Sequence, residues 1–220
     1  MTGAKAQART GPLVLALSAA TVLLGALSLW LYVSGQPPAD DSAEAGFARD
    51  MSVHHAQAVE MAEIVRDKTQ SDEIRVLASD VALTQQAQIG QMQGWLSAWR
   101  LPATGTEPAM AWMGMPTEGR MPGMASPEEI GRLNDSPPAE ADRLFLRLMI
   151  PHHRAALGMT EAVLEETDRP EVGELARAIS ASQKAEISAM EDMLRARGGE
   201  SPAGGPGEGG EPMPGMGHGG

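Results

Sequence analysis

The sequence predicts an all-α protein: a four-helix bundle built from two repeated helical hairpins and preceded by one N-terminal transmembrane helix. Three features lead to this prediction. They are an uncharged apolar run near the N-terminus, an internal repeat with a constant offset of 98 residues, and apolar residues at helical spacing within each copy. No stretch shows the alternation of apolar and polar residues that is typical of a β-strand.

Composition narrows the class of function before any motif is considered. The 220 residues carry a net charge of −12, which argues against non-specific nucleic-acid binding because such binding needs a basic surface. The absence of cysteine excludes disulfide frameworks, thiolate zinc sites and iron–sulfur clusters. Because there is no cysteine, methionine and histidine are the soft or borderline metal ligands that remain. Methionine is unusually common, at 15 residues.

The apolar run at residues 12–33 contains no charged side chain. A helix of this length spans roughly 33 Å, about the thickness of a bilayer core. Lys5 and Arg9 precede the run and acidic residues follow it, so the positive-inside rule places residues 1–11 in the cytoplasm and the rest of the chain outside it. We expect a single-pass membrane anchor; the alternative is a signal peptide whose cleavage releases a secreted or periplasmic protein.

One pattern recurs 98 residues further along the chain. Phe47, Met51, His54 and His55 are matched by the same residue types in the second copy, and 18 of 50 aligned positions are identical. The match stays in register across a helix, a turn and a second helix, so we interpret it as a duplicated hairpin. The predicted organisation is a linker at 34–43 and a bundle domain at 44–197, with repeats at 44–100 and 139–197 joined by a connection at 101–138.

Capping residues set the expected ends of the helices. Asp41 and Glu44 have capping-box spacing at the first helix, and Ser71 caps the second. At the fourth helix, Asp168 is the expected cap, Glu171 closes a capping box, and Pro170 lies near the first turn. The predicted helices are 42–68, 72–100, 139–167 and a fourth that begins after Asp168.

Two segments contain methionine among turn-forming residues. The connection is rich in Gly and Pro and includes a short helix predicted after Ser126, while residues 198–220 form a Gly/Pro/Met tail that we expect to be disordered. The thioethers here either wrap a Cu(I) ion or, in the connection, cap the open end of the bundle with Trp112 as a plug. These secondary candidates are Met113, Met115, Met121, Met124, Met213, Met216 and His218.

The main candidate ligands form a Met-x-x-His-His motif in each copy. On a helix, positions i, i+3, i+4 and i+7 share a face, so each histidine pair lies beside two methionines. Di-iron bundles carry Glu-x-x-His at this spacing, and replacing the carboxylate with a soft thioether favours Cu(I) or Ag(I). The alternative is that the methionines fill the core and the histidines are structural. The candidate ligands are Met51, His54, His55 and Met61 in the first copy, and Met149, His152, His153 and Met159 in the second.

Other residues near the motif have possible supporting roles. Gln85 and Gln183 lie close to the apolar stripes and could hydrogen-bond the second nitrogen of a ligating histidine, or simply contact water at the boundary. Pro151 lies well inside the third helix, where it either kinks the helix and re-aims His152 and His153 or is tolerated without effect.

The motif resembles that of the domain-of-unknown-function family 305, DUF305. The resemblance extends over about residues 44–197 and rests on the segments around Met51-x-x-His54-His55 and Met149-Ile-Pro-His152-His153 and on the connection Met121-Pro-Gly-Met124. It implies a ferritin-like four-helix fold and a place among the CopM-like copper-binding proteins of bacterial envelopes. By this resemblance, the matching methionines and histidines are copper ligands.

These observations together predict an extracytoplasmic copper-binding protein, not an enzyme, that buffers or delivers Cu(I) or confers resistance to it. Its expected partners are the metal ion, the membrane and an unidentified copper transporter or acceptor, without nucleic acid. Because histidine ligates metal as neutral imidazole, binding should weaken below about pH 6. The alternatives are a membrane-anchored module that binds a partner or senses stress without metal, and a ferritin-like oxidoreductase that would use Glu60, Glu63 and Glu161.

Overall fold

The computed structural model describes residues 10–34 and 36–202, and all regular secondary structure in these ranges is helical apart from one isolated bridge between Ala109 and Thr117. The chain divides into two compact units, Met1–Pro38 and Ala39–Gly220. The first unit contains helix α1 (Thr10–Ser34), where the sequence predicts a helix. Within the described part of the chain, no helix combines the length and apolarity needed to cross a membrane, so the predicted transmembrane span is not confirmed.

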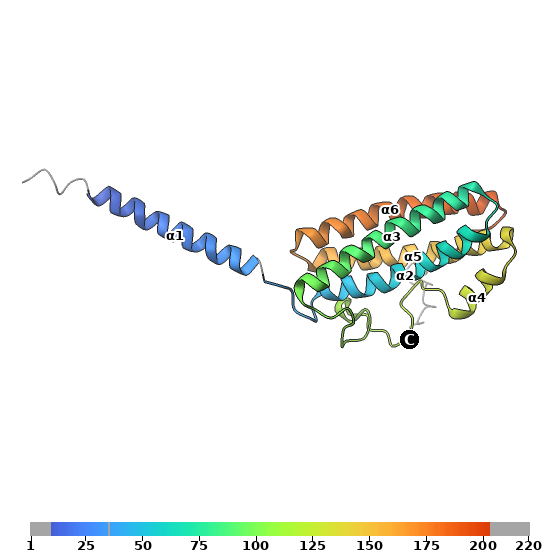
Figure 1. Cartoon of the computed structure of the whole chain (residues 1–220), viewed down its shortest axis with the longest axis horizontal. Coiled ribbons are helices and arrows are strands. Elements are labelled where there is room, and N and C mark those ends of the chain that lie inside the picture. The colour runs from blue at the N-terminus through green and yellow to red at the C-terminus, as the bar shows by residue number, and fades with distance from the viewer. Residues whose placement is uncertain (1–9, 35, 203–220) are drawn as a thin grey trace, which may run out of the picture. The chain divides into compact units, whose positions relative to one another are not determined.

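The second unit is a bundle of four long helices joined as two hairpins (Figure 1). Helix α2 packs against α3 and α5, and α5 packs against α6. The short helices η1 and α4 lie in the connection between the hairpins. The bounds are α2 (Ala43–Lys68), α3 (Asp72–Trp99), η1 (Ala111–Met113), α4 (Pro127–Asp135), α5 (Pro138–Glu166) and α6 (Pro170–Ala196).

The repeat is visible in the turns of the two hairpins. The Thr69 hydroxyl accepts a hydrogen bond from the backbone N–H of Ser71 (3.0 Å), and the Thr167 hydroxyl accepts one from Arg169 (3.1 Å). Each hydroxyl closes a tight turn that carries the chain into the next helix. The predicted Asp168 cap is wrong: Arg169 is the N-cap of α6 and makes no side-chain capping bond.

Serine residues cap α2, α3 and α4, whereas α5 begins after Pro137 without a side-chain capping bond. Ser42, rather than the predicted Asp41, accepts from the third residue along at the start of α2, and Ser71 does so at the start of α3. Ser126 and Glu129 form the full capping box at α4. These short side chains satisfy N–H groups that have no partner in the first turn of a helix.

The apolar core of the bundle is divided into two clusters by a layer of polar side chains. One cluster, the Phe145 cluster, joins the second half of α2 to the first half of α5. The other, the Phe47 cluster, joins the first half of α2 to the second half of α5. The two helices are therefore antiparallel, and the middle of each one faces the polar layer.

Residues 198–202 were assigned by sequence to the disordered tail, but the structure holds them against the bundle. The Arg154 guanidinium donates to the Pro202 carbonyl (2.8 Å) and to Glu191 (2.6 Å), and the backbone N–H of Gly199 bonds to the Leu194 carbonyl. The folded chain therefore continues at least to Pro202. Met213, Met216 and His218 lie outside the described residues.

Candidate metal centre

The polar layer that divides the core consists of four histidines and four longer polar side chains. All four histidine side chains have an exposed fraction of zero, and the three glutamines are also buried. Glu186 reaches the edge of the layer, with 19% of its side chain exposed. We call this set the histidine layer: His54, His55, Gln85, Gln88, His152, His153, Gln183 and Glu186.

The layer brings the two repeats into direct contact. The imidazole rings of His54 on α2 and His152 on α5 have centroids 3.8 Å apart, with an angle of 33° between their planes. These two residues occupy the same position in their repeats, so the contact lies where the two copies meet. The rings of His152 and His153 are further apart, at 6.3 Å.

Oxygen acceptors fix the protonation of three of these rings. The Nε2 atom of His55 lies 2.8 Å from the Gln88 amide oxygen, and the Nε2 atom of His153 lies 2.6 Å from a Glu186 carboxylate oxygen. His54 Nε2 faces the backbone carbonyl of Pro122 at 3.2 Å. Because these oxygens only accept hydrogen bonds, each Nε2 carries the proton, and in the neutral ring Nδ1 has the free lone pair.

The opposite ring nitrogens have no partner. In the described chain, ten buried side-chain nitrogen and oxygen atoms lack a hydrogen bond, and nine of them belong to the histidine layer. They include Nδ1 of all four histidines, Nε2 of His152, and both amide atoms of Gln85 and Gln183. Buried polar atoms without partners are rare and unfavourable, so their concentration in one layer makes this layer the candidate binding site.

Burial keeps the imidazoles of His54, His55 and His152 neutral. Desolvation lowers the pKa of His54 to about 4 and that of His55 to about 3, with smaller contributions from neighbouring histidines. Burial also places the pKa of His152 well below its usual value. The Nδ1 lone pairs of His54 and His55, and one ring nitrogen of His152, are therefore available at neutral pH, as ligation by histidine requires.

The motif methionines are buried in the two core clusters on either side of the histidine layer. Met51 and Met159 lie in the Phe47 cluster, while Met61 and Met149 lie in the Phe145 cluster. Each is at most 1% exposed, so each also fills the core. The antiparallel packing of α2 and α5 thus pairs a methionine of one repeat with a methionine of the other on each side of the histidines.

The arrangement limits the metals that could bind. Among the described residues, no three His, Asp or Glu side chains converge into a metal site on their own. A structural zinc site uses four nitrogen, oxygen or sulfur ligands, which this set does not supply without methionine. A soft ion that accepts imidazole together with thioether fits the available donors better.

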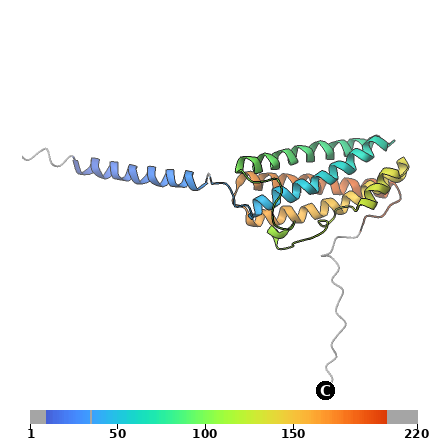
Figure 2. The same cartoon turned by 60° about the horizontal axis from the view of Figure 1, so that its bottom comes forward.

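A segment of the connection between the hairpins covers the histidine contact. We call residues 121–125 the strap; Figure 2 shows the connection running along the bundle beside α5. Pro122 and Gly123 occupy the middle of a turn closed by a Met124–Met121 backbone bond, and Gly123 has φ +76°. A positive φ at this position of a Pro-Gly turn is typical of type II. Gln57 then clamps Ala125, donating to its carbonyl (3.0 Å) and accepting from its N–H (2.7 Å).

The strap lies so close to α5 that only glycine fits at its centre. A Cβ atom on Gly123 would lie 2.6 Å from the Pro151 carbonyl oxygen and 3.0 Å from the Cα atom of His152. Pro151 itself does not break the helix, since α5 runs continuously from Pro138 to Glu166. The tight approach therefore takes place at the proline that precedes the second histidine pair.

The other methionines of the connection mostly serve the apolar core. Met121 is buried in the Phe47 cluster, Met113 and Met124 pack against that cluster, and only Met115 is largely exposed, at 55%. Trp112 packs edge-on against Phe47, which agrees with the interpretation of the connection as a cap.

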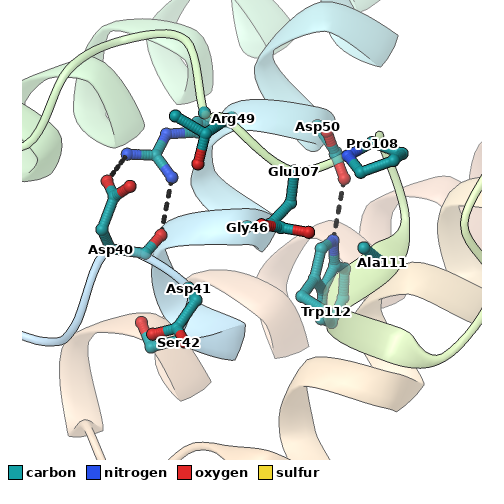
Figure 3. Close-up of a pocket in the computed structure, with 12 residues that line it drawn as sticks. Asp40, Asp41, Ser42, Gly46, Arg49, Asp50, Glu107, Pro108, Ala111 and Trp112 are labelled. Carbon is teal, nitrogen blue, oxygen red and sulfur yellow. Dashed lines mark hydrogen bonds and ion pairs between the residues drawn. The ribbon is translucent and has the colours of Figure 1, made fainter.

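The cap is held by charged residues at the start of α2 (Figure 3). Asp50 accepts bonds from the Met110 backbone (2.7 Å) and the Trp112 indole (2.9 Å), and burial raises its pKa. Arg49 pairs with Asp40 beside a cavity of about 440 Å³. No histidine lines this cavity, so it is separate from the histidine layer.

Two expectations about supporting residues change with the structure. Gln85 and Gln183 do not bond a histidine, as their amide atoms have no partner, and Gln88 and Glu186, one turn further on, make those bonds. Each of these two residues is a polar side chain three positions after the predicted glutamine, and this spacing is the sequence signal that could have revealed Gln88 and Glu186. The carboxylates proposed for oxidase chemistry are all exposed: Glu60, Glu63 and Glu161.

Fold and site together define a four-helix bundle with a buried histidine layer at the junction of two repeats. The chain belongs to the DUF305 family, a domain of unknown function, whose match covers residues 44–194. A search of curated proteins found no match.

Solved structures of the same fold include DUF305 proteins from two bacteria. One, from Streptomyces coelicolor and attributed to the secreted proteins, is 46% identical, has a TM-score of 0.71 and is matched over 74% of this chain and 99% of its own. A fragment from Deinococcus radiodurans is 37% identical, with a TM-score of 0.61, and is matched over 73% of this chain and 99% of its own.

A third neighbour, CopM, has been solved with metal. It is 28% identical, has a TM-score of 0.54 in its Cu(II)-bound form, and is matched over 70% of this chain and 97% of its own. It has also been solved in Cu(I)-bound and Ag-bound forms. The match covers nearly the whole of each of these solved chains, and the second unit of this chain, Ala39–Gly220, is compact by itself.

Proposed function

We propose that this protein binds Cu(I) in its histidine layer, and Ag(I) in the same place. The observation that carries the proposal is the set of buried Nδ1 atoms without partners, on rings whose other nitrogen is held by an oxygen acceptor in three cases out of four. This is the arrangement that prepares histidine for ligation, because the bonded nitrogen fixes the tautomer and orientation of the ring.

Several features favour copper over other metals. The histidines are flanked by buried thioethers and only one carboxylate bonds to them, which suits a soft monovalent ion. Di-iron chemistry needs carboxylates at the centre, and the glutamates available for it are on the surface. CopM, a structural neighbour, has been solved with both Cu(I) and Ag. We therefore infer binding, and buffering or delivery, rather than catalysis.

The site of action that we propose is outside the cytoplasm. The apolar segment at 12–33 supports export, and the relative from Streptomyces coelicolor to which secretion is attributed supports it independently. N-terminal sequencing of the protein from membrane and soluble fractions of its host would separate a retained anchor from a cleaved signal peptide. Delivery further requires an acceptor protein or transporter for Cu(I).

The test is a competitive Cu(I) titration of the bundle from Ala39 onward against a chromophoric chelator. We expect tight binding that is lost when His54→Leu and His152→Leu are combined. The matched control changes Met113→Leu and Met115→Leu in the connection, and it should bind like the wild type. If the double-histidine variant binds Cu(I) as tightly as the wild type, or if the wild type does not bind, the proposal is wrong.

A further inference from the structure

The two repeats hold their outer histidines with chemically different groups. Gln88 and Glu186 occupy equivalent positions, 98 residues apart, and each accepts a bond from the Nε2 atom of the second histidine of its pair. In the first repeat the acceptor is a neutral amide oxygen, and in the second it is a carboxylate oxygen. The histidine layer is therefore symmetric in geometry and asymmetric in charge.

No second carboxylate offsets charge in the layer. In the described chain, Glu186 is the only acidic side chain hydrogen-bonded to any of the four histidines. The nearby guanidinium of Arg154 is paired with Glu191 and the Pro202 carbonyl. Asp50, on the turn before the first pair, is bonded to the cap. The layer thus combines imidazole, amide and thioether groups with a single carboxylate at its edge.

A buried site favours a bound ion whose charge it neutralises. Uncompensated charge in a protein interior is strongly unfavourable, because the protein replaces only part of the solvation that water provides. One carboxylate balances one positive charge. A divalent ion in the same layer would leave one net positive charge in a region where all four histidines are fully buried.

We propose that the single carboxylate of the histidine layer, Glu186, with the neutral amide of Gln88 at the equivalent position, sets the balance between monovalent and divalent ions: one carboxylate neutralises a monovalent ion, and a second would favour a divalent one. Glu186 acts through His153 as a positioning residue and through its charge as the counter-ion. This inference rests on the proposed function, since it concerns the selectivity of the same site.

The repeat supplies the experiment with its own controls. Glu186→Gln gives the second repeat the amide that the first repeat has naturally, so a hydrogen-bond acceptor is kept and only the charge is lost. Gln88→Glu places a second carboxylate at the equivalent position. The combined variant moves the single negative charge from one repeat to the other without changing the total.

The measurement is the dissociation constant for Cu(I) and for Zn(II), at one neutral pH, in the bundle from Ala39 onward, with circular dichroism to check folding. We expect Glu186→Gln to weaken Cu(I) binding about tenfold or more, within the range usual for groups that support a metal ligand. It should weaken Zn(II) binding by a larger factor, because a carboxylate attracts a divalent ion more strongly than a monovalent one. We expect Gln88→Glu to strengthen Zn(II) binding relative to Cu(I) by a similar factor. The combined variant should return to the wild-type ratio, a result that a purely structural role of Glu186 would not produce.

The outcomes separate the two proposals. If the wild type does not bind Cu(I), the proposed function is wrong. If the wild type binds Cu(I) but the ratio of the two constants is unchanged in both Glu186→Gln and Gln88→Glu, the role of Glu186 in selectivity is wrong while copper binding stands. Should one single variant fail to fold, the other decides the question, because each changes the charge in the opposite direction.

Discussion

Replacing His152 with leucine should stabilise the metal-free protein, although it removes a candidate ligand. Both ring nitrogens of His152 are buried without a partner, which no other histidine in the described chain shows. A neutral imidazole has one donor and one acceptor, so the folded state leaves both unsatisfied. Leucine has a similar volume and no polar atom to desolvate.

The size of the effect follows from these two atoms. Each unsatisfied buried polar group costs about 1–3 kcal/mol, and imperfect packing of the new side chain takes back up to about 1.5 kcal/mol. We therefore expect His152→Leu to raise the free energy of unfolding of the metal-free bundle by about 2–4 kcal/mol. For a domain of this size, the melting temperature should rise by about 5–15 °C.

The assay is urea unfolding of the bundle from Ala39 onward with all metal removed by chelation. His55→Leu is the matched control, because it also replaces a fully buried histidine but leaves the Gln88 amide oxygen without its donor. Its gain should be clearly smaller. Most substitutions in a core destabilise, so the sign alone is informative. If His152→Leu is no more stable than His55→Leu, the nitrogens of His152 are satisfied in solution and the argument for an open site fails.

Of three further predictions, two concern pH and one concerns the strap. Because burial lowers the pKa of His54 from its usual value of 6.5 to about 4, the unfolded chain binds more protons than the folded one between these values. Stability should thus be complete above about pH 6.5 and fall towards pH 4, by about 3 kcal/mol from His54 alone, as urea midpoints at several pH values would show. Cu(I) affinity should persist below pH 6, where the sequence alone predicted weakening, and a sharp loss at pH 6 would contradict the low pKa. Gly123→Ala adds a Cβ atom 2.6 Å from a backbone oxygen, at a residue with positive φ. It should lower the free energy of unfolding by about 1–3 kcal/mol and speed the release of Cu(I). An unchanged release rate would show that the strap does not limit exchange.

The helices were predictable because their patterns are long and repeated. The predicted spans 42–68, 72–100 and 139–167 agree with α2, α3 and α5 to within one residue at each end. Apolar spacing over seven turns leaves few alternatives, and a repeat in register supplies the same information twice. Errors occur where a single side chain determines the end of a helix. At the start of α6, for example, the Thr167 turn replaces the expected aspartate cap.

The composition of the histidine layer was only partly predictable. The motif identified two histidines and two methionines on each of two helices. It could not show that His54 and His152 meet across the repeats. The orienting residues on α3 and α6 depend on the rotation of those helices about their own axes. An error of about 100° in that rotation moves the face by one residue, so Gln85 and Gln88 were both compatible with the sequence pattern.

The strap explains why the two copies have diverged where they have. A duplicated hairpin creates two equivalent surfaces, but the single connection between the copies can cover the junction only once. Gln57 and Ala155 are equivalent positions; the long one clamps the strap at Ala125, and the short one lies against Gly123. Exchanging the two residues would leave Ala125 without its clamp. It would also put a long side chain at position 155, where the Ala155 Cβ atom already lies so close that a Cβ atom added to Gly123 would be 2.7 Å from it. The asymmetry of the cover over the site therefore follows from joining two equivalent halves with one chain.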